Sequence, residues 1–524
     1  MYATIADVFR QTVLKHPKQE AIVDVRKNVR WTYAQWDAHV NRLANALTEA
    51  GIRKGDTVST FLYNGVEFSS VYFACAKIGA VINPINFRLK EREIHYILSD
   101  ADTRLLVYEQ ALKEEVEKAS AAIPHLIRWM VDPQEADAAV GYYDRVGRAS
   151  TAPPEADLTE EDICSVMYSS GTTGRPKGVL HRHREIVEQS MAMIAYMHYA
   201  EGEKGLIVNP MFHCGELHSG FFSRVHVGGG NVIMHRFDAR KALRLMQDER
   251  IASMVAVPTI WKMLLQEDLS QYDLSHFRVG MYGGESMEPA VIRECLDRFG
   301  IDLVQAYGMT EMGPTVALLT FSRGNPPLHK AGAAGKAVLN HEIRVVRLND
   351  DGPTKPDETL PPGEVGEIIV RGSCVMAGYR NNETATREAM HDGWYRTGDL
   401  GYKDEDGDLW VVDRKSNMIV SGGENIYPKE IEYTLAEHPA VRETAVVGAP
   451  DAKWGETVVA FVVAKSPVTE AELNEHCKRH LANYKRPRKY FFVAELPRNG
   501  AGKVLHRQLK EMAKSNLIAQ EESQ

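Results

Sequence analysis

The sequence predicts an α/β protein with a large N-terminal domain of parallel-rich α/β sheets, a small β-barrel-like subdomain and a small α+β C-terminal domain. Two observations predict it: short apolar runs alternate with segments of helical periodicity over much of the chain, and this alternation gives way to short β-rich runs after Pro326. Strand–helix alternation is typical of parallel strands covered by helices. At 524 residues the chain is also too long for one ordinary core.

The first elements follow the order that such a fold requires. Thr32 is predicted to cap a helix over 33–50, and Gly51 stands where that helix ends. Residues 131–160, rich in Asp, Glu, Ala and Pro, predict a loop. The pattern further predicts a helix at 68–79 and strands at 58–62, 80–85, 105–108, 205–208, 231–234, 254–257 and 303–305.

A change of pattern predicts the domain boundary. The β-rich runs at 343–346, 365–371 and 409–412 predict the barrel-like subdomain. A new α+β pattern begins near Asp413, with helices expected at 430–437 and 470–481 and strands at 441–447 and 457–463. We therefore expect domains over 1–413 and 414–524, with a disordered end in the last ten residues.

The bulk composition excludes several classes of protein. Contents of 44% hydrophobic and 25% charged residues are typical of a globular protein, and a net charge of −9 argues against nucleic-acid binding. The six cysteines form no CxxC pair, which predicts free thiols in the cytoplasm. Because Lys77 and Pro84 interrupt the apolar run 71–85, and the N-terminus has no signal core, we expect no integral membrane segment.

The stretch 168–179 carries the first candidate for chemistry. It holds three glycines, four Ser/Thr hydroxyls and Lys177, so backbone N–H groups, hydroxyls and an ammonium can face a polyphosphate. It is not a Walker A loop, because Arg175 follows Gly174. A polar surface turn is the alternative. The candidate phosphate-binding residues are Ser169, Ser170, Gly171, Thr172, Thr173, Gly174 and Lys177.

This stretch resembles the phosphate loop of the ANL superfamily of adenylate-forming enzymes, which includes acyl-CoA synthetases, peptide-synthetase adenylation domains and luciferases. Similar signatures recur in the family's order up to residue 504, so the resemblance covers nearly the whole chain. It implies ATP, Mg²⁺ and coenzyme A as cofactors. It also implies a mobile C-terminal domain that rotates between two half-reactions.

Residues 305–311 are similar to the family's strongest nucleotide motif. The resemblance implies that Tyr307 stacks on adenine, Thr310 contacts the α-phosphate and Glu311 holds Mg²⁺, a metal that prefers oxygen ligands. Without that motif, a lone glutamate is most often a solvated surface residue.

The turn at 283–286 resembles the family's adenine-binding turn. The implied adenine contacts are Gly283, Gly284 and Glu285, through their backbone. Glu285 and Ser286 stand where the family more often has Ala and Pro, so roles for their side chains stay open. Taken alone, such a Gly-Gly turn is more often structural.

Two motifs near the predicted boundary resemble ribose and hinge motifs. Asp399 ends the 395–399 motif, and its carboxylate can accept hydrogen bonds from both ribose hydroxyls. Arg414 is expected to reach the ribose or a phosphate. Ser416 occupies the hinge position where relatives usually carry Asp or Lys, so only its backbone is expected to act there.

The C-terminal region carries two further matches. By resemblance, Gly422, Gly423 and Glu424 line a pantetheine tunnel, which favours a thioester-forming enzyme. Lys503, in a glycine-containing loop, is expected to bridge the substrate carboxylate and the α-phosphate. A loop lysine is otherwise nearly always solvated.

His213 follows Phe212 and resembles the family's aromatic gate beside the acyl carboxylate. The run 213–218 also contains Cys214, Glu216 and His218, but it lacks HExxH spacing and a CxxC partner, so a metal site is the weaker interpretation. Packed core histidines are a further alternative.

Three functions remain open. The first is an ATP-dependent acyl-CoA ligase (an acid–thiol ligase). The second is an adenylating enzyme that loads an amino acid onto a carrier protein; His213 counts against it, because peptide synthetases carry Asp there. The third is a catalytically dead nucleotide-binding protein, and the joint presence of Lys503, Glu311 and Asp399 counts against it.

Only a few residues indicate which carboxylic acid is the substrate. Gly215 stands where 4-coumarate ligases usually carry a bulky aromatic residue, which predicts a deep pocket, and Glu216 and His218 add polarity that an alkyl chain does not need. A medium- or long-chain fatty acid is the first choice, and an aryl acid of the cinnamate or benzoate type is the second. The predicted partner is thus a small-molecule carboxylic acid, with a homodimer left open. The expected apolar walls are Leu217, Phe221, Phe222, Trp261 and Met309.

Overall fold

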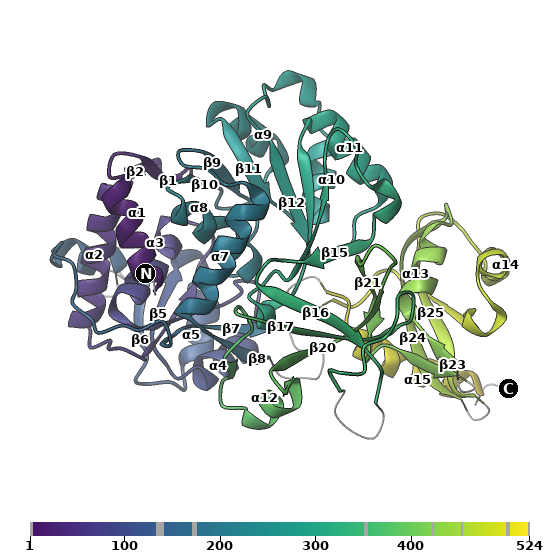
Figure 1. Cartoon of the computed structure of the whole chain (residues 1–524). Coiled ribbons are helices and arrows are strands. Elements are labelled where there is room, and N and C mark those ends of the chain that lie inside the picture. The colour runs from purple at the N-terminus through teal and green to yellow at the C-terminus, as the bar shows by residue number, and fades with distance from the viewer. Residues whose placement is uncertain are drawn as a thin grey trace. The chain divides into compact units, whose positions relative to one another are not determined.

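The computed structural model of the chain describes residues 4–132, 141–169, 176–349, 355–421, 424–451, 454–498 and 503–521 (Figure 1). The chain divides into two compact units. The first consists of residues 1–171, 175–343 and 370–395, and the second of residues 172–174, 344–369 and 396–524. The boundary at residue 414 was predicted to separate an N-terminal domain from a C-terminal domain that rotates against it. This boundary stays a prediction.

One sheet of the first unit has the strand order β18-β8-β7-β4-β3-β5-β6. The strands β7, β4, β3, β5 and β6 run parallel, as the strand–helix alternation predicts, whereas β8 and β18 are antiparallel to their neighbours. The bounds are β3 (Thr57–Phe61), β4 (Val81–Pro84), β5 (Thr103–Glu109), β6 (Ile127–Val131), β7 (Ile163–Ser169), β8 (Lys177–Arg182) and β18 (Gly378–Tyr379).

The other sheet of this unit has the order β2-β1-β10-β9-β11-β12-β13-β14-β15. Its strands from β1 to β13 are parallel, and β2, β14 and β15 are antiparallel to their neighbours. The bounds are β1 (Glu20–Asp24), β2 (Val29–Thr32), β9 (Lys204–Ile207), β10 (Gly230–Ile233), β11 (Ile251–Val255), β12 (Val279–Gly283), β13 (Asp302–Tyr307), β14 (Ala317–Phe321) and β15 (Ala333–Ala337).

Helices cover these sheets, and the predicted helix start at Thr32 is confirmed. The Thr32 hydroxyl accepts the N–H of Gln35, whose side chain accepts the N–H of Thr32, a reciprocal cap. Phe9 and Phe73 stack with ring centroids 4.2 Å apart in the core. The helices of this unit include α1 (Ile5–Lys15), α2 (Tyr33–Glu49), α3 (Val66–Ile78), α4 (Glu91–Asp100), α5 (Lys113–Ser120), α7 (His183–Met197), α8 (Ser223–His226), α9 (Ala239–Asp248), α10 (Pro258–Leu265), α11 (Pro289–Phe299) and α12 (Glu383–Ala389).

Two expectations about irregular segments are wrong. The stretch expected to be a loop over 131–160 contains α6 (Tyr142–Arg148), because Tyr142 and Val146, four residues apart, bury their side chains on one face of a helix. The end expected to be disordered continues as α15 (His506–Glu521) through residue 521. Leu509 and Ala513 of α15 are fully buried and anchor it to its sheet.

The second unit contains the β-rich runs and the C-terminal α+β pattern that the sequence predicts. Half of β16 (His341–Val346), most of β17 (Gly366–Gly372) and β20 (Trp394–Lys403) and all of β21 (Leu409–Arg414) belong to it. Its C-terminal sheet has the order β23-β22-β25-β24, with β26 beside β25. The remaining bounds are β22 (Ile419–Ser421), β23 (Glu424–Ile426), β24 (Val441–Asp451), β25 (Gly455–Ala464), β26 (Lys489–Phe492), α13 (Pro428–Ala436) and α14 (Glu470–His480).

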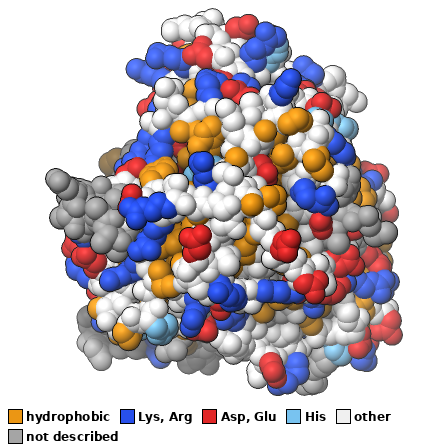
Figure 2. All heavy atoms as spheres, turned by 90° about the vertical axis from the view of Figure 1, so that its left-hand side faces the viewer, with side chains coloured by type: hydrophobic (Ala, Val, Ile, Leu, Met, Phe, Trp, Pro, Cys, Tyr) orange, Lys and Arg blue, Asp and Glu red, His pale blue; other side chains and the backbone are white. Residues whose placement is uncertain are grey.

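The surface of the face drawn in Figure 2 mixes the two charge signs, with lysine and arginine beside aspartate and glutamate and small apolar patches between them. No helix in the described part of the chain is both long enough and apolar enough to cross a membrane.

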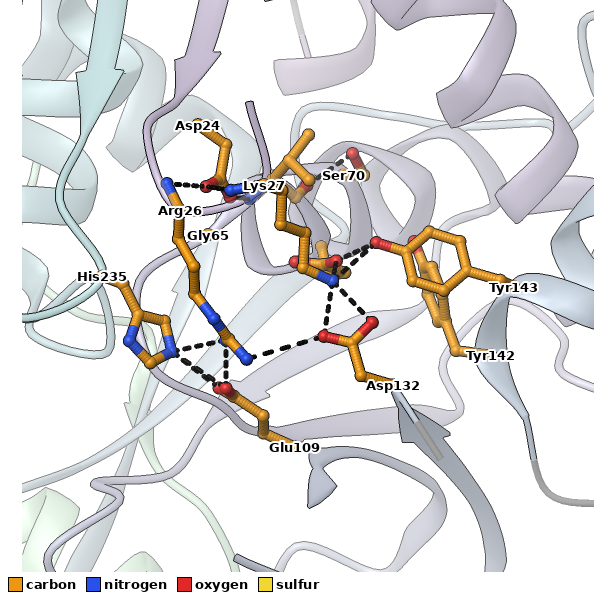
Figure 3. Close-up of polar contacts among 12 residues, drawn as sticks. Asp24, Arg26, Lys27, Gly65, Ser70, Glu109, Asp132, Tyr142, Tyr143 and His235 are labelled. Carbon is orange, nitrogen blue, oxygen red and sulfur yellow. Dashed lines mark hydrogen bonds and ion pairs between the residues drawn. The ribbon is translucent and has the colours of Figure 1, made fainter. Parts of the chain in front are cut away.

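A network of charges links six segments of the first unit (Figure 3). Lys27, in the β1–β2 turn, pairs with Glu67 of α3 and lies 2.9 Å from Asp132, which follows β6. Arg26 pairs with Glu109 at the end of β5, and His235 lies 2.9 Å from the same carboxylate. The Glu67 side chain is only 7% exposed, so its charge depends on Lys27 and on the hydroxyl of Tyr143 from α6.

We predict that Lys27→Met destabilises the fold by about 3–5 kcal/mol, the usual cost of leaving a buried charge unpaired. Chemical unfolding of the variant measures it. Lys118→Met, which removes an exposed i,i+4 partner of Glu114, is the control and should change the free energy of unfolding little. Adding Glu67→Gln to Lys27→Met should restore part of the lost free energy of unfolding, because it removes the unpaired charge. Equal stability of the two lysine variants would contradict the role of the network.

Candidate active site

The ends of the β7–β8 hairpin carry the first site residues. Ser169 is the last residue of β7 and pairs in register with Lys177, the first residue of β8. The two side chains therefore lie on the same face of the sheet, directly opposite each other. The residues predicted between them, Ser170, Gly171, Thr172, Thr173 and Gly174, lie outside the described residues.

Glu311 is held against this hairpin from the other sheet. It belongs to the short helix η5 (Thr310–Met312) after β13, and only 7% of it is exposed. Its Oε1 accepts hydrogen bonds from the Ser169 hydroxyl at 3.3 Å and the Tyr379 hydroxyl at 3.2 Å. Lys177 Nζ lies 4.9 Å from the centroid of the Tyr379 ring. The four side chains thus form one cluster.

This carboxylate suits a divalent cation. No described residue donates a hydrogen bond to Oε2 of Glu311, while Oε1 is fixed by two hydroxyls. One oxygen is therefore oriented by the protein and the other is available as a ligand. Magnesium prefers such carboxylate oxygens and is commonly held by one or two of them together with substrate phosphates. Glu311 therefore fits the predicted metal role.

Thr310 and His213 flank Cys214. Cys214 Sγ lies 3.4 Å from the Thr310 hydroxyl, and the N–H of Gly215 donates to His213 Nδ1 at 3.1 Å. Residues 215–222 form the π-helix η3 (Gly215–Phe222), a rare element that is frequent at functional sites. The predicted gate and the predicted phosphate contact are thus neighbours.

The predicted adenine-binding residues follow two adjacent strands. Gly283 ends β12 and pairs in register with Ala306 of β13, one residue before Tyr307. A Cβ on Gly283 would lie 2.8 Å from the carbonyl oxygen of Ala306, so only glycine fits there. Gly284 has a φ of +80°, and Glu285 follows it at the carboxyl ends of the strands, where α/β proteins bind ligands.

In the second unit, Asp399 and Arg414 are paired partners of β20 and β21. Arg414 Nε lies 2.5 Å from Asp399 Oδ1, and the Asp399 side chain is 6% exposed. Beyond Arg414, the carbonyl oxygen of Ser416 accepts a hydrogen bond from Lys510 Nζ at 3.3 Å. The predicted ribose and hinge residues therefore occupy one short region.

The C-terminal candidates lie in exposed positions. Glu424 begins β23 and pairs with Ser421, while Gly422 and Gly423 lie outside the described residues. Lys503 is exposed and directly precedes Val504, which bridges to Arg498.

Two residues of the first unit that position site residues were not identified from the sequence. Tyr379 holds Glu311, although it lies 68 residues away in the sequence. Asn64 positions the segment before His213: its amide donates to the carbonyl oxygen of Asn209 at 2.8 Å and accepts the N–H of Met211 at 2.8 Å. The sequence signal for Asn64 is weak: it is a polar residue in the loop shortly after the strand β3.

Glu216 does not contribute the pocket polarity that the sequence predicts. It is buried and paired with Arg224, whose Nη2 lies 3.1 Å from Glu216 Oε1 and whose Nε donates to Asn231 at 2.7 Å. Burial raises the pKa of Glu216 to about 7, an effect that Arg224 opposes. Through Arg224, Glu216 of η3 is thus connected with α8 and with Asn231 of β10.

Four of the five expected apolar wall residues are buried, in different surroundings, whereas Met309 is only half-buried. Phe221 and Phe222 pack on Phe73 of α3 at 5.9 and 6.2 Å, and Trp261 packs on Phe277. Among the described residues, no group of three potential metal ligands forms around His213 and His218; the one such group is Asp404, Asp406 and Asp408 in the second unit.

The sequence matches the AMP-binding enzyme family over residues 9–380 and the AMP-binding enzyme C-terminal domain over residues 430–503. The chain belongs to the AMP-binding enzyme family. The resemblance to the acyl-CoA synthetase branch of the ANL superfamily is thereby confirmed.

The relatives are ligases of different acids. The chain is 36% identical to the long-chain-fatty-acid–CoA ligase FadD13 of Mycobacterium tuberculosis, over 96% of this chain and 97% of that protein. It is 36% identical to a feruloyl-CoA synthase of an Amycolatopsis species, over 90% and 92%. The o-succinylbenzoate CoA synthetase (MenE) of Bacillus subtilis, solved with its acyl-adenylate intermediate, has a TM-score of 0.84 at 32% identity, over 96% and 97%. That synthetase is also solved with ATP and a magnesium ion, with a TM-score of 0.84 at 31% identity, over 96% and 99%.

We predict that Gly220→Ala destabilises the fold, because a Cβ there would lie 2.5 Å from Glu216 Oε1 and would disturb its pairing with Arg224. Overpacking of this kind costs about 1–3 kcal/mol. Gly147→Ala is the matched control: no atom lies within 4 Å of its added Cβ, and alanine favours the helix α6. Thermal melting compares the two variants. A Gly220→Ala protein as stable as the Gly147→Ala protein would contradict the packing argument.

Proposed function

We propose that the protein is an ATP-dependent, AMP-forming acyl-CoA ligase that activates a carboxylic acid as an acyl-adenylate and transfers the acyl group to coenzyme A. The observation that carries the proposal is the Glu311 carboxylate, fixed by two hydroxyls beside Lys177 with one oxygen available. Family membership over both matched regions supports it.

The reaction has two steps. A carboxylate oxygen of the acid attacks the α-phosphorus of ATP, an O–P bond forms, and the bond to the β-phosphate breaks to release pyrophosphate. The sulfur of coenzyme A, having lost its proton, then attacks the acyl carbon; the C–S bond forms and AMP leaves with the former carboxylate oxygen. Positioning and neutralisation of charge are the main tasks of the protein.

The first unit supplies most groups of the first step. Ser169 and Lys177, with residues 170–174 between them, are proposed to bind the phosphates, and Thr310 to contact the α-phosphate. Glu311 is proposed to hold Mg²⁺, which neutralises phosphate charge when bound. His213 is proposed as the gate beside the carboxylate, in a segment that Asn64 holds in place.

The second unit is proposed to complete the site in two arrangements. Asp399 and Arg414 bind the ribose, and Lys503 neutralises charge between the carboxylate and the α-phosphate during adenylation. The loop at 422–424 then replaces Lys503 to admit pantetheine. A rotation of residues 414–524 about Arg414–Ser416 exchanges the two loops, since backbone dihedrals alone can serve as a hinge.

The acid is a fatty acid of medium or long chain or an aryl acid. The likeness to a long-chain ligase supports the first class, and the likeness to a feruloyl-CoA synthase supports the second. Loading of a carrier protein is the alternative fate of the acyl group. The six cysteines are buried and none of them is in a disulfide bond, which supports the proposed cytoplasmic location. A homodimer stays a prediction.

Acid-dependent exchange of labelled pyrophosphate into ATP tests this function, since it requires a reversible adenylation and no coenzyme A. We expect exchange with at least one fatty or aryl acid. Binding of ATP without exchange for any acid in a broad panel would instead support the catalytically dead nucleotide-binding protein.

We predict that Glu311→Gln raises the Mg²⁺ concentration needed for half-maximal exchange, while the KM for the acid moves little. The amide keeps the shape and loses the charge that holds the metal. Glu288→Gln, which removes an exposed partner of Lys262, is the control and should leave the metal requirement unchanged. An unaltered Mg²⁺ dependence in Glu311→Gln would exclude the metal role.

We predict that Lys503→Ala slows adenylation by about 10²–10³-fold, the usual effect of removing one electrostatic donor. Thioester formation from a supplied acyl-adenylate should persist, because Lys503 is proposed to have left the site by then. Lys478→Ala, on the exposed face of α14, is the control. Equal loss of both half-reactions would show that Lys503 acts otherwise.

A further inference from the structure

Two buried imidazoles face each other behind the candidate site. His181 lies in β8 and His218 in η3; both are 0% exposed, and their ring centroids are 6.4 Å apart. Within the described part of the chain, none of their four ring nitrogens has a hydrogen-bond partner. The hydroxyl of Tyr72, whose ring lies 6.2 Å from His218, also has none there. We call His181, His218 and Tyr72 the polar end group.

Buried polar groups destabilise the folded protein unless they form hydrogen bonds. A buried donor or acceptor without a partner costs about 1–3 kcal/mol, and native proteins pair the great majority of them. The polar end group presents five such atoms beside the apolar core cluster of the first unit. Water or a polar part of a ligand is therefore needed among these three side chains.

The position of the polar end group connects it with the acid. His218 lies five residues after His213, and Gly215–Phe222, the π-helix η3, carries it. His181 lies four residues after Lys177 in β8, on the same face of the strand and about 13 Å away. A substrate whose carboxylate lies between His213 and Lys177 can thus reach the polar end group with its far end.

The chemistry of the two rings restricts what they can hold. Burial lowers the pKa of His181 to about 4, and burial lowers the pKa of His218 well below its ordinary value. Both rings are therefore neutral at pH 7, and each offers one N–H donor and one nitrogen acceptor. This set suits an uncharged hydroxyl or carbonyl group. It does not suit a second carboxylate, which needs a cation, or a plain hydrocarbon end, which leaves the nitrogens unpaired.

We infer that His181, His218 and Tyr72 form the far end of the acyl-binding site and select a carboxylic acid that carries an uncharged hydroxyl or carbonyl group within about 13 Å of its carboxylate. This inference rests on the proposed ligase function and narrows its substrate class to oxygenated acids, either aryl or aliphatic. A plain fatty acid is a poorer substrate because it leaves buried donors and acceptors unsatisfied.

Matched pairs of acids test the inference. The pairs are 4-hydroxycinnamate with cinnamate and 8-hydroxyoctanoate with octanoate, and kcat/KM is measured by AMP release. We expect the wild-type enzyme to prefer the hydroxylated member of at least one pair by about tenfold or more. In His218→Leu and His181→Leu, that ratio should fall to near one, because only the hydroxylated acid loses hydrogen-bond partners. A wild-type ratio near one in both pairs, or a ratio that neither variant changes, would overturn the inference.

Melting temperatures separate substrate binding from a structural role. Each leucine variant removes unpartnered polar atoms, so we expect it to melt at the wild-type temperature or above. If the rings instead hold structural water, the variants should melt lower and keep the wild-type ratio of the two acids, which would overturn the inference. His183→Leu is the control: His183 is buried but accepts the N–H of Ile5, so its loss should lower the melting temperature and leave the ratio unchanged.

The same assay distinguishes the inference from the function on which it rests. If no acid of any kind supports AMP release or pyrophosphate exchange, the proposed ligase function fails. If acids are activated but without preference for the hydroxylated members, the ligase function stands and only the assignment of the polar end group fails.

Discussion

The site depends on the contact that fixes Glu311. This glutamate follows a strand of one sheet, and its Oε1 accepts hydrogen bonds from Ser169 and Tyr379, which belong to the other. The contact joins the hairpin that is proposed to bind the phosphates to the segment that carries Tyr307 and Thr310. The contact thereby orients the Glu311 carboxylate, which is proposed to hold Mg²⁺, and joins the two sheets where the substrate phosphates are proposed to bind.

Much of the fold could be predicted because periodicity and local signals agree. The helix cap at Thr32 and the strand–helix alternation are confirmed, since both depend on residues close in sequence. The short helix at 142–148 was missed because its composition is that of a loop, and only the burial of Tyr142 and Val146 makes it helical. Tertiary packing decides such segments.

Site residues that belong to a sequence motif could be predicted. Site residues that are brought into place by packing could not. Glu311 stands in a recognisable stretch, whereas its partner Tyr379 has no signature of its own and is found only through the fold. Glu216 and His218 seemed alike as polar residues of one helix. The structure separates them, because Arg224 neutralises Glu216 while both nitrogens of His218 remain unpartnered in the described part of the chain. No sequence pattern distinguishes these environments.

The central claim is that a carboxylate oxygen of the acid attacks the α-phosphorus of ATP, and isotope transfer tests it most directly. An acid that the enzyme activates is labelled with ¹⁸O at both carboxylate oxygens and converted in the presence of ATP, Mg²⁺ and coenzyme A. The account predicts one ¹⁸O atom in each AMP released and one in the acyl-CoA, as measured by mass spectrometry. Unlabelled AMP, or label in ADP or inorganic phosphate, would contradict it.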